Sequence, residues 1–169
     1  MHTNQLPTMN MDVSESGCCP KFDPTQWDKQ EVNFDNKLFV KGKTRSFLHI
    51  PLNMGKMYKE LFGAIKSSNA ELDDGYLILS HDPSAWRGEH LIAVKSDVSG
   101  CEMVRLSGTF LTKVYEGSFK EMRTWMKDLE EYIQSQNKNL KKMYFFYTTC
   151  PKCAKHWGKN YVVGFAEVE

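Results

Sequence analysis

Apolar side chains recur with helical spacing in two segments of the chain. The first set is Met54, Met57, Tyr58, Leu61, Phe62 and Ile65, and the second is Met122, Trp125, Met126, Leu129 and Ile133. Residues spaced by three, four and seven positions lie on one face of a helix. The pattern predicts amphipathic helices over 54–65 and 122–133, with Asn53 as a cap for the first. Ser118 and Glu121 form a capping box before the second.

Extended apolar segments surround both helices and predict strands. They lie at residues 38–50, 76–79, 91–94, 104–115, 143–147 and 161–165. Each is bounded by turn-forming residues and is rich in Val, Ile, Leu, Phe or Tyr, as is typical of strands. The resulting order is strand, helix, strand, strand, and this order occurs twice, which predicts an α+β fold.

The two halves share a motif before their last strand. Trp86-Arg87-Gly88-Glu89-His90 precedes one strand, and Trp157-Gly158-Lys159-Asn160-Tyr161 precedes the other. A chance match is one explanation, but the shared element order and helix spacing favour a duplication, with repeats over about 38–96 and 103–168. Pairing the repeats would make one antiparallel sheet with both helices on one face. The other face would curve into a ligand cleft at the junction.

The chain before residue 38 has a different composition. Residues 1–17 are rich in Thr, Asn, Ser and Met, and we expect a flexible arm. Residues 18–37 contain prolines and aromatic side chains, which predict an ordered coil packed on the domain. Residues 38–169 are then a single domain.

Composition excludes several classes of partner. The 169 residues carry a net charge of +1 and no long apolar segment. Nucleic acids and anionic membranes require clustered basic surface, so we expect neither as a partner. The N-terminal residues lack a secretory pattern, and we expect a cytoplasmic location, where the five cysteines would not form a disulfide framework.

The chain resembles the GyrI-like small-molecule-binding superfamily. The residues that carry the resemblance are Leu106–Gly117 with the Tyr115–Phe119 turn, Trp125–Ile133, Tyr144–Tyr147 and Asn160–Val168, and the Cys18–Phe22 and Cys150–Cys153 segments resemble a smaller branch. The resemblance covers about residues 38–168. It implies a duplicated strand-helix-strand-strand fold with an aromatic-walled cleft, in which a carboxylate meets cationic or amphipathic ligands. Some members are hydrolases of reactive electrophilic natural products.

This chain departs from the superfamily in two ways. It has no DNA-binding helical region, and Asn160 and Tyr161 replace the acidic residue that usually opens the final strand. The matching carboxylate in the first repeat is Glu89, so an acid or base role would move there.

Several polar and aromatic side chains near the strand ends are candidates for this cleft. The catalytic candidates are Glu89 and Tyr161, and the ligand-binding candidates are Trp86, Trp157, Tyr147, Tyr115 and His49. Aromatic faces bind planar or cationic ligands, and a glutamate in an apolar site has a raised pKa and can act as a base. The alternative is that the aromatic residues pack in the core and that Glu89 is solvated.

Four cysteines form a separate candidate site. Cys150 and Cys153 have the two-residue spacing that lets two thiolates bind one tetrahedral ion, and Cys18 and Cys19 are candidates for the remaining ligands, with His156 as a substitute. Structural zinc, free thiols and redox or disulfide chemistry remain open. A redox pair should lie at a helix N-terminus, whereas we expect the sequence after Cys153 to return to a strand.

These patterns lead to three functional hypotheses. The first is capture of an aromatic or cationic small molecule in the inter-repeat cleft. The second is hydrolysis of an electrophilic small molecule with Glu89 as the base. The third is a metal or thiol redox module built on the cysteines.

Overall fold

The computed structural model describes residues 2–169, which fold into one antiparallel sheet with three α-helices. The elements in chain order are β1 (Glu31–Phe47), β2 (Ile50–Pro51), α1 (Met54–Ser67), β3 (Ile78–Ser84), β4 (Arg87–Ala93), β5 (Glu102–Glu116), α2 (Met122–Ser135), β6 (Leu140–Tyr147), α3 (Pro151–Trp157) and β7 (Tyr161–Val168). Two short 3₁₀ helices, η1 (Pro24–Gln26) and η2 (Phe119–Glu121), precede β1 and α2. The predicted α+β class and the two long helices are confirmed, whereas α3 was not expected.

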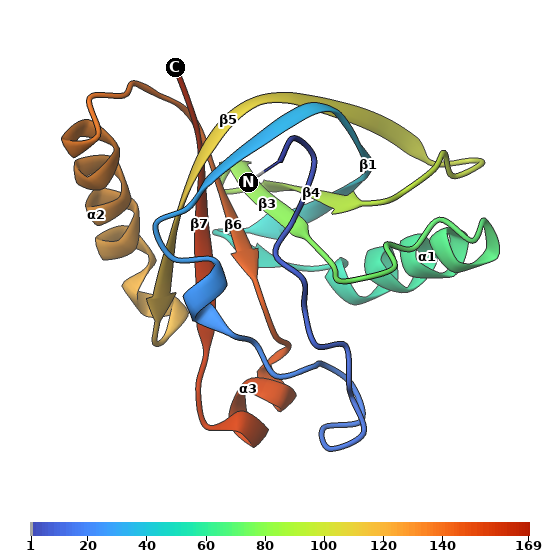
Figure 1. Ribbon diagram of the computed structural model, residues 1–169. Helices are drawn as coiled ribbons and strands as arrows, with labels where there is room; N and C mark the ends of the chain where they lie inside the picture. Colours follow the sequence, from blue (N-terminus) through green and yellow to red (C-terminus); the bar gives the residue numbers. More distant parts are fainter. Residues whose placement is uncertain (1) are drawn as a thin grey trace.

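The sheet closes into a barrel because β1 pairs on both sides. The strand order is β2-β1-β4-β3-β6-β7-β5, and β1 also pairs with β5 (Figure 1). The first part of β1 pairs with β5 from Glu31 to Lys41, and the later part pairs with β4 from Phe39 to Arg45. An irregularity between Phe34 and Lys37 interrupts the register, and such bulges bend a strand. One long, bent strand therefore joins the two repeats.

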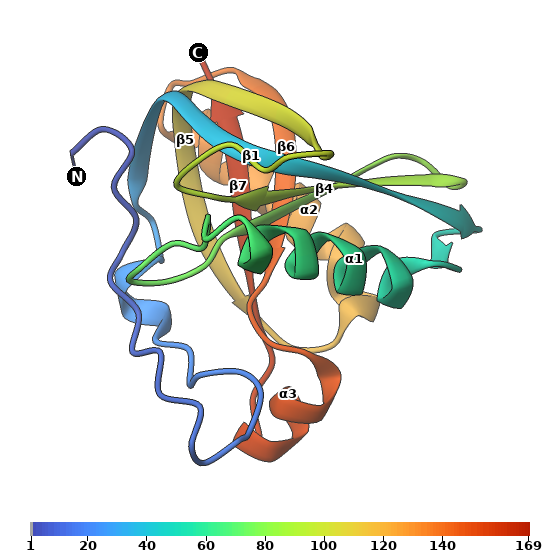
Figure 2. The ribbon, with the colours of Figure 1, turned by 90° about the vertical axis from the view of Figure 1, so that its right-hand side faces the viewer.

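Both long helices pack on the outer face of the barrel, as the duplication predicted (Figures 1 and 2). Two strand glycines let the helices approach the sheet closely. A Cβ on Gly42 in β1 would lie 2.6 Å from Met57 Sδ of α1, and a Cβ on Gly164 in β7 would lie 2.6 Å from Leu129 Cδ2 of α2. Each helix thereby covers its own repeat.

The inner face of the barrel is filled by large apolar side chains. Its buried cluster comprises Phe22, Trp27, Val32, Phe34, Phe39, Leu77, Leu79, Leu91, Ala93, Phe110, Tyr144, Phe146, Val163 and Phe165. Because side chains alternate across a strand, the residues between these positions on each strand point to the outer face. The concave face that we expected to form a ligand cleft is instead the filled interior of the barrel.

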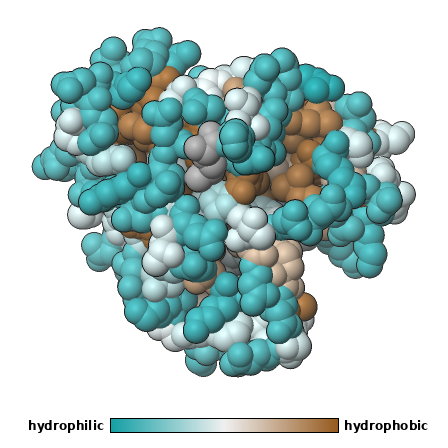
Figure 3. All heavy atoms as spheres, viewed as in Figure 1, coloured by the Kyte–Doolittle hydropathy of each residue, from teal (hydrophilic) through white to brown (hydrophobic). Residues whose placement is uncertain are grey.

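The N-terminal residues lie against the domain rather than apart from it. The Asn4 amide donates to the Asn33 carbonyl, and the Met9 amide donates to the Asp74 carbonyl, so part of the expected flexible arm is docked. The predicted coil ends earlier than residue 37, because β1 already begins at Glu31. The segment crosses the front of the barrel in Figure 1, and most of that face is hydrophilic in Figure 3.

The close approach of α2 to β7 predicts that Gly164→Ala destabilises the protein. The added methyl group would overlap Leu129, and overpacking of this kind costs about 1–3 kcal/mol of unfolding free energy. Gly63→Ala is the matched control, because nothing lies within 4 Å of its Cβ position on α1. Alanine loses less backbone conformational entropy on folding than glycine, so Gly63→Ala should raise the unfolding free energy by about 0.5–1 kcal/mol. Urea unfolding of both variants measures this, and equal effects would contradict the packing.

Candidate functional site

Glu89 lies on the inner face of β4, near one end of the barrel. Its carboxylate is 3.3 Å from the Lys41 ammonium and 4.0 Å from that of Lys142. Burial acts to raise the pKa of Glu89, but the hydrogen bond and charge of Lys41, with help from Lys142, outweigh it and lower the pKa. Glu89 is therefore an ion-paired carboxylate, and the raised pKa expected of a general base is absent.

Tyr161 lies near the opposite end of the barrel interior. Its ring is 5.9 Å from that of Phe22, in the N-terminal segment. Phe165, four residues further along β7, is the strand partner of Tyr144 on β6. The Tyr144 ring lies 5.9 Å from the ring of His81, and His81 is the strand partner of Glu89. Glu89 is therefore close to the level of Phe165 in the barrel. Four residues of strand span about 13 Å. The structure therefore does not bring the two catalytic candidates together.

Trp86 and His49 lie in exposed turns. Trp86, between β3 and β4, is 54% exposed, and its ring packs edge-on against Phe47 at 5.6 Å. His49, between β1 and β2, places Nδ1 4.0 Å from Asp82 Oδ2. The two candidates lie close in the fold, because the His49 amide donates to the Ala85 carbonyl next to Trp86.

Tyr115 and Trp157 lie elsewhere. Tyr115 is buried beneath α2, where it stacks on Trp125 at 5.5 Å and donates a hydrogen bond to Asp128. Trp157 ends α3, with the Lys21 ammonium 5.9 Å from its ring. Tyr115 thus has a packing role, and Trp157 lies beside the N-terminal segment.

Tyr147 lies on the outer face of β6, where the two repeats meet. Its ring packs edge-on against Phe119 of η2 at 5.3 Å and is 37% exposed. Burial of its hydroxyl raises the pKa of Tyr147 to about 12, with further contributions from the charge of Asp82 and from Tyr58 of α1. Tyr147 therefore packs on Phe119 of its own repeat and lies within electrostatic range of Tyr58 and Asp82 of the first repeat, and we call Tyr58, Asp82, His90, Phe119 and Tyr147 the junction cluster.

His90 is the buried centre of this cluster. Its Nδ1 lies 2.8 Å from Ser80 Oγ and 3.2 Å from the Tyr58 hydroxyl, and its Nε2 lies 3.1 Å from Thr44 Oγ1. Burial lowers the pKa of His90, against the opposing charge of Asp82, so the ring is neutral at neutral pH. These hydrogen bonds hold the His90 ring in one orientation at the buried side of the cluster.

Asp82 lies at the exposed side of the same cluster. A Cβ on Gly88 would lie 3.1 Å from both Asp82 Oδ1 and His90 Nε2, which places the carboxylate beside the histidine on the outer face. Among residues 2–169, Asp82 has no lysine or arginine within ion-pair distance, and the basic side chain that lies within 4.0 Å of it is the His49 imidazole. It is therefore a carboxylate whose charge is not neutralised by a permanent cation.

Two aromatic residues at the cluster are exposed. Phe62 stacks on Tyr58 at 5.6 Å and is 46% exposed, and Phe119, a member of the cluster, is 47% exposed. Tyr58, Asp82 and His90 were not among the site residues predicted from the sequence. His90 closed the repeated tryptophan motif, but only the outward direction of its side chain distinguishes it from Glu89.

The four cysteines converge as the sequence predicted. The Sγ atoms of Cys18, Cys19, Cys150 and Cys153 all lie within 4.8 Å of one another and could hold a metal ion. Cys18 Sγ is 3.7 Å from Cys19 Sγ and 3.8 Å from Cys150 Sγ. His156 is not needed as a substitute ligand, and its Nε2 lies 3.5 Å from a Glu15 oxygen.

The expectation that a strand follows Cys153 was wrong. Cys150 is the N-cap of α3, with Pro151 in its first turn and Gly158 in a left-handed conformation at its end. Burial acts to raise the pKa of the Cys150 thiol, but the Cys153 amide and the neighbouring thiols lower it to about 7. Burial raises the pKa of Cys19. Cys150 therefore does lie at a helix N-terminus, as a redox pair requires, and thiolate formation at Cys150 also suits metal binding.

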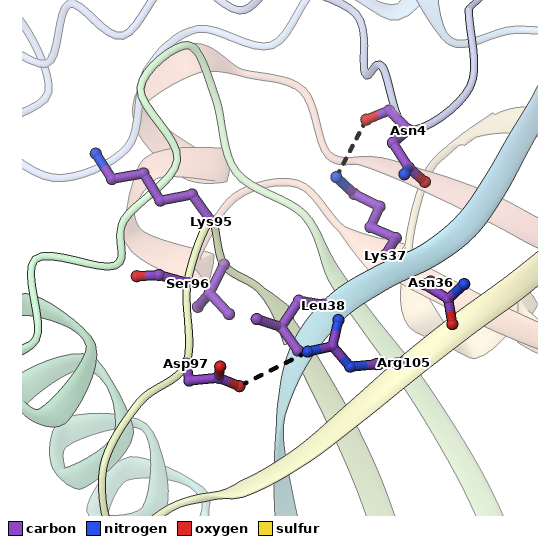
Figure 4. A pocket seen from close by; sticks show the side chains of 9 residues that line it. Asn4, Asn36, Lys37, Leu38, Lys95, Ser96, Asp97 and Arg105 are labelled. Atoms are coloured by element: carbon purple, nitrogen blue, oxygen red, sulfur yellow. Dashed lines mark hydrogen bonds and ion pairs between the residues drawn. The ribbon is translucent and has the colours of Figure 1, made fainter.

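A shallow cavity of about 380 Å³ lies away from both clusters, beside the N-terminal residues (Figure 4). The buried Lys37 ammonium donates to the Asn4 carbonyl, and an Arg105 nitrogen lies 4.0 Å from an Asp97 oxygen. Lys37 and Arg105 thus have partners in Asn4 and Asp97. The Lys37–Asn4 hydrogen bond attaches the N-terminal residues to the barrel at this cavity.

A family model described as bacterial hydrolase matches residues 9–168. No curated protein matches. No helix within residues 2–169 is long and apolar enough to cross a membrane.

Three solved structures share the fold at low identity. An uncharacterized conserved protein from Listeria innocua is 12% identical (TM-score 0.62; 84% of this chain and 92% of that chain covered). A hydrolase from Listeria innocua is 13% identical (TM-score 0.61; 88% of this chain and 94% of that chain covered). SAV2435, in a structure with bound tetraphenylphosphonium, is 12% identical (TM-score 0.50; 84% of this chain and 94% of that chain covered). The chain shares the fold of these structures, as the GyrI-like resemblance implied, and belongs to the bacterial hydrolase family.

Proposed function

We propose that the protein binds an organic cation with aromatic groups at the junction cluster. The observation that carries the proposal is the contrast between two carboxylates on opposite faces of the sheet. Glu89 is neutralised by Lys41 and Lys142, whereas Asp82 is half-exposed, close enough for its charge to raise the pKa of Tyr147, and without a lysine or arginine partner among the described residues. An unneutralised carboxylate attracts a cation, and aromatic faces add cation–π attraction.

The position of the cluster supports the same ligand class. Tyr58 comes from the first repeat, Phe119 and Tyr147 come from the second, and the buried His90 holds Tyr58 by a hydrogen bond. A flat or bulky aromatic cation could contact rings from both repeats while its charge faces Asp82. A solved structure with the same fold contains tetraphenylphosphonium, a cation of this chemical class.

Hydrolysis of an electrophilic small molecule is a second candidate, favoured by the family description. Glu89 remains the proposed base and Tyr161 its proposed partner. The lowered pKa of Glu89 keeps it ionised at neutral pH but makes it a weaker base than an unpaired, buried carboxylate. The separation of the two residues makes this candidate the weaker one.

We also propose that the four-cysteine cluster holds a structural zinc ion in a cytoplasmic protein. Four thiolates around zinc at about 2.3 Å form a tetrahedron whose edges measure about 3.8 Å. The Cys18–Cys19 and Cys18–Cys150 sulfur distances of 3.7 and 3.8 Å support this geometry. All five cysteines are free thiols in the structure, which suits a reducing compartment.

Tetraphenylphosphonium binding tests the proposed ligand class. Asp82→Asn removes the charge but preserves the shape, and we expect it to raise the Kd about tenfold in isothermal titration calorimetry. Asp73→Asn, at an exposed aspartate paired with Lys95, is the matched control and should leave the Kd unchanged. Unaltered binding by Asp82→Asn, or no binding by the wild type, would contradict the proposal.

Turnover tests the second candidate. If the protein hydrolyses an activated ester or epoxide, Glu89→Gln should lower kcat by about 10²-fold while circular dichroism shows an unchanged fold. A panel of such substrates, followed by product chromatography, makes the measurement. Turnover that survives in Glu89→Gln would exclude this carboxylate as the base.

Metal content tests the zinc site. Protein purified without chelator should contain about one zinc per chain by plasma mass spectrometry. Cys150→Ser should lose most of this zinc, whereas Cys101→Ser, outside the cluster, should retain it. Equal zinc content in both variants would show that the metal binds elsewhere.

A further inference from the structure

We infer that the cysteine site clamps the N-terminal segment over one end of the barrel, and that metal release uncovers a second, aromatic binding site inside the barrel. The inference rests on the proposed zinc site. The segment concerned is residues 18–30, which we call the plug. The uncovered site would take a flat, apolar aromatic molecule.

The cysteines join parts of the chain that are distant in sequence. Cys18 and Cys19 begin the plug, whereas Cys150 and Cys153 lie at the start of α3. The Cys150 amide also lies 3.5 Å from Cys19 Sγ. An ion shared by all four thiolates would fasten the first residues of the plug to the loop between β6 and β7.

The plug carries two aromatic side chains into the barrel end. Phe22 and Trp27 are 6% and 2% exposed. The Phe22 ring lies 6.2 Å from that of Phe146 and 5.9 Å from that of Tyr161. The Trp27 ring lies 5.3 Å from Phe146 and 6.4 Å from Phe165. The plug therefore occupies the barrel end as an aromatic ligand would.

The plug has a second attachment at its other end. Thr112 Oγ1 donates to the Trp27 carbonyl, and Asp28 Oδ1 accepts from the Val114 amide, both on β5. With metal bound, the plug is a short loop held at both ends, so its rings have a high effective concentration at the barrel. Without metal, the bonds from the four thiolates are lost, whereas the β5 attachment, the ring packing and the Lys21–Trp157 contact remain, so local opening becomes easier.

Opening would expose an aromatic surface on the inner face of the sheet. Phe146, Tyr161 and Phe165 would lose their contacts with the plug. Tyr147, in the junction cluster, points to the outer face of the same strand as Phe146. The uncovered surface is therefore distinct from the site proposed for the organic cation.

Hydrogen exchange of the full-length protein tests the clamp. After zinc removal by a chelator, we expect amides of residues 20–30 to exchange at least tenfold faster, while those of β5 and β7 remain protected. The aromatic dye 1-anilinonaphthalene-8-sulfonate, which fluoresces when its rings bind apolar surface, should then gain fluorescence several-fold. Cys150→Ser should show both changes without chelator, and Cys101→Ser should behave as wild type.

A second variant distinguishes the effect of plug packing from the effect of metal loss. Phe22→Ala removes a ring but no thiol, so it should retain about one zinc per chain and bind the dye without chelator. Unchanged exchange of residues 20–30 after zinc loss would overturn the clamp but leave the zinc site intact. Exchange throughout β5 and β7 would also overturn it, because the metal would then stabilise the whole fold. Protein that binds no zinc would overturn both.

Discussion

The pairing of β1 with β5 is the constraint on which the rest of the structure depends. It joins the first strand of each repeat and turns a two-repeat sheet into a closed barrel. Closure gives every strand an inner and an outer face, and alternation then assigns each side chain to one of them. The interior becomes an aromatic core, and the space for ligands moves to the outer face and the barrel ends.

This division explains why two nearby carboxylates have different chemistry. Glu89 faces inward, where a carboxylate is costly unless paired, and Lys41 and Lys142 neutralise it. Asp82 faces outward beside His90 and keeps its charge accessible. The fold thus stabilises one acidic group by pairing and leaves the other free to interact with a ligand.

The plug depends on the same closure. A barrel end lined by Phe146 and Tyr161 would expose apolar surface to water, and residues 18–30 cover it with Phe22 and Trp27. So short a segment has little secondary structure of its own beyond the three residues of η1. Its position is therefore set by contacts with the barrel and by the thiols at its start.

The sequence by itself determined the local elements and the composition of the cysteine site. The 3.6-residue periodicity of 54–65 and 122–133 is a property of neighbouring residues, so both helices could be predicted, and their recurrence indicated the duplication. α3 was missed because seven residues are too few to show periodicity, although Pro151 and Gly158 carry the usual start and stop preferences.

Only the tertiary structure decided which of these residues meet. Cys18 lies 132 positions from Cys150, and no local pattern specifies that their sulfur atoms approach to 3.8 Å. Similarly, alternation along β4 puts the adjacent Glu89 and His90 on opposite faces, but only the pairing of β4 with β1 and β3 decides that Glu89 is the one that faces inward. Residue type and spacing follow from short-range chemistry, whereas the direction and partners of a side chain depend on long-range strand pairing.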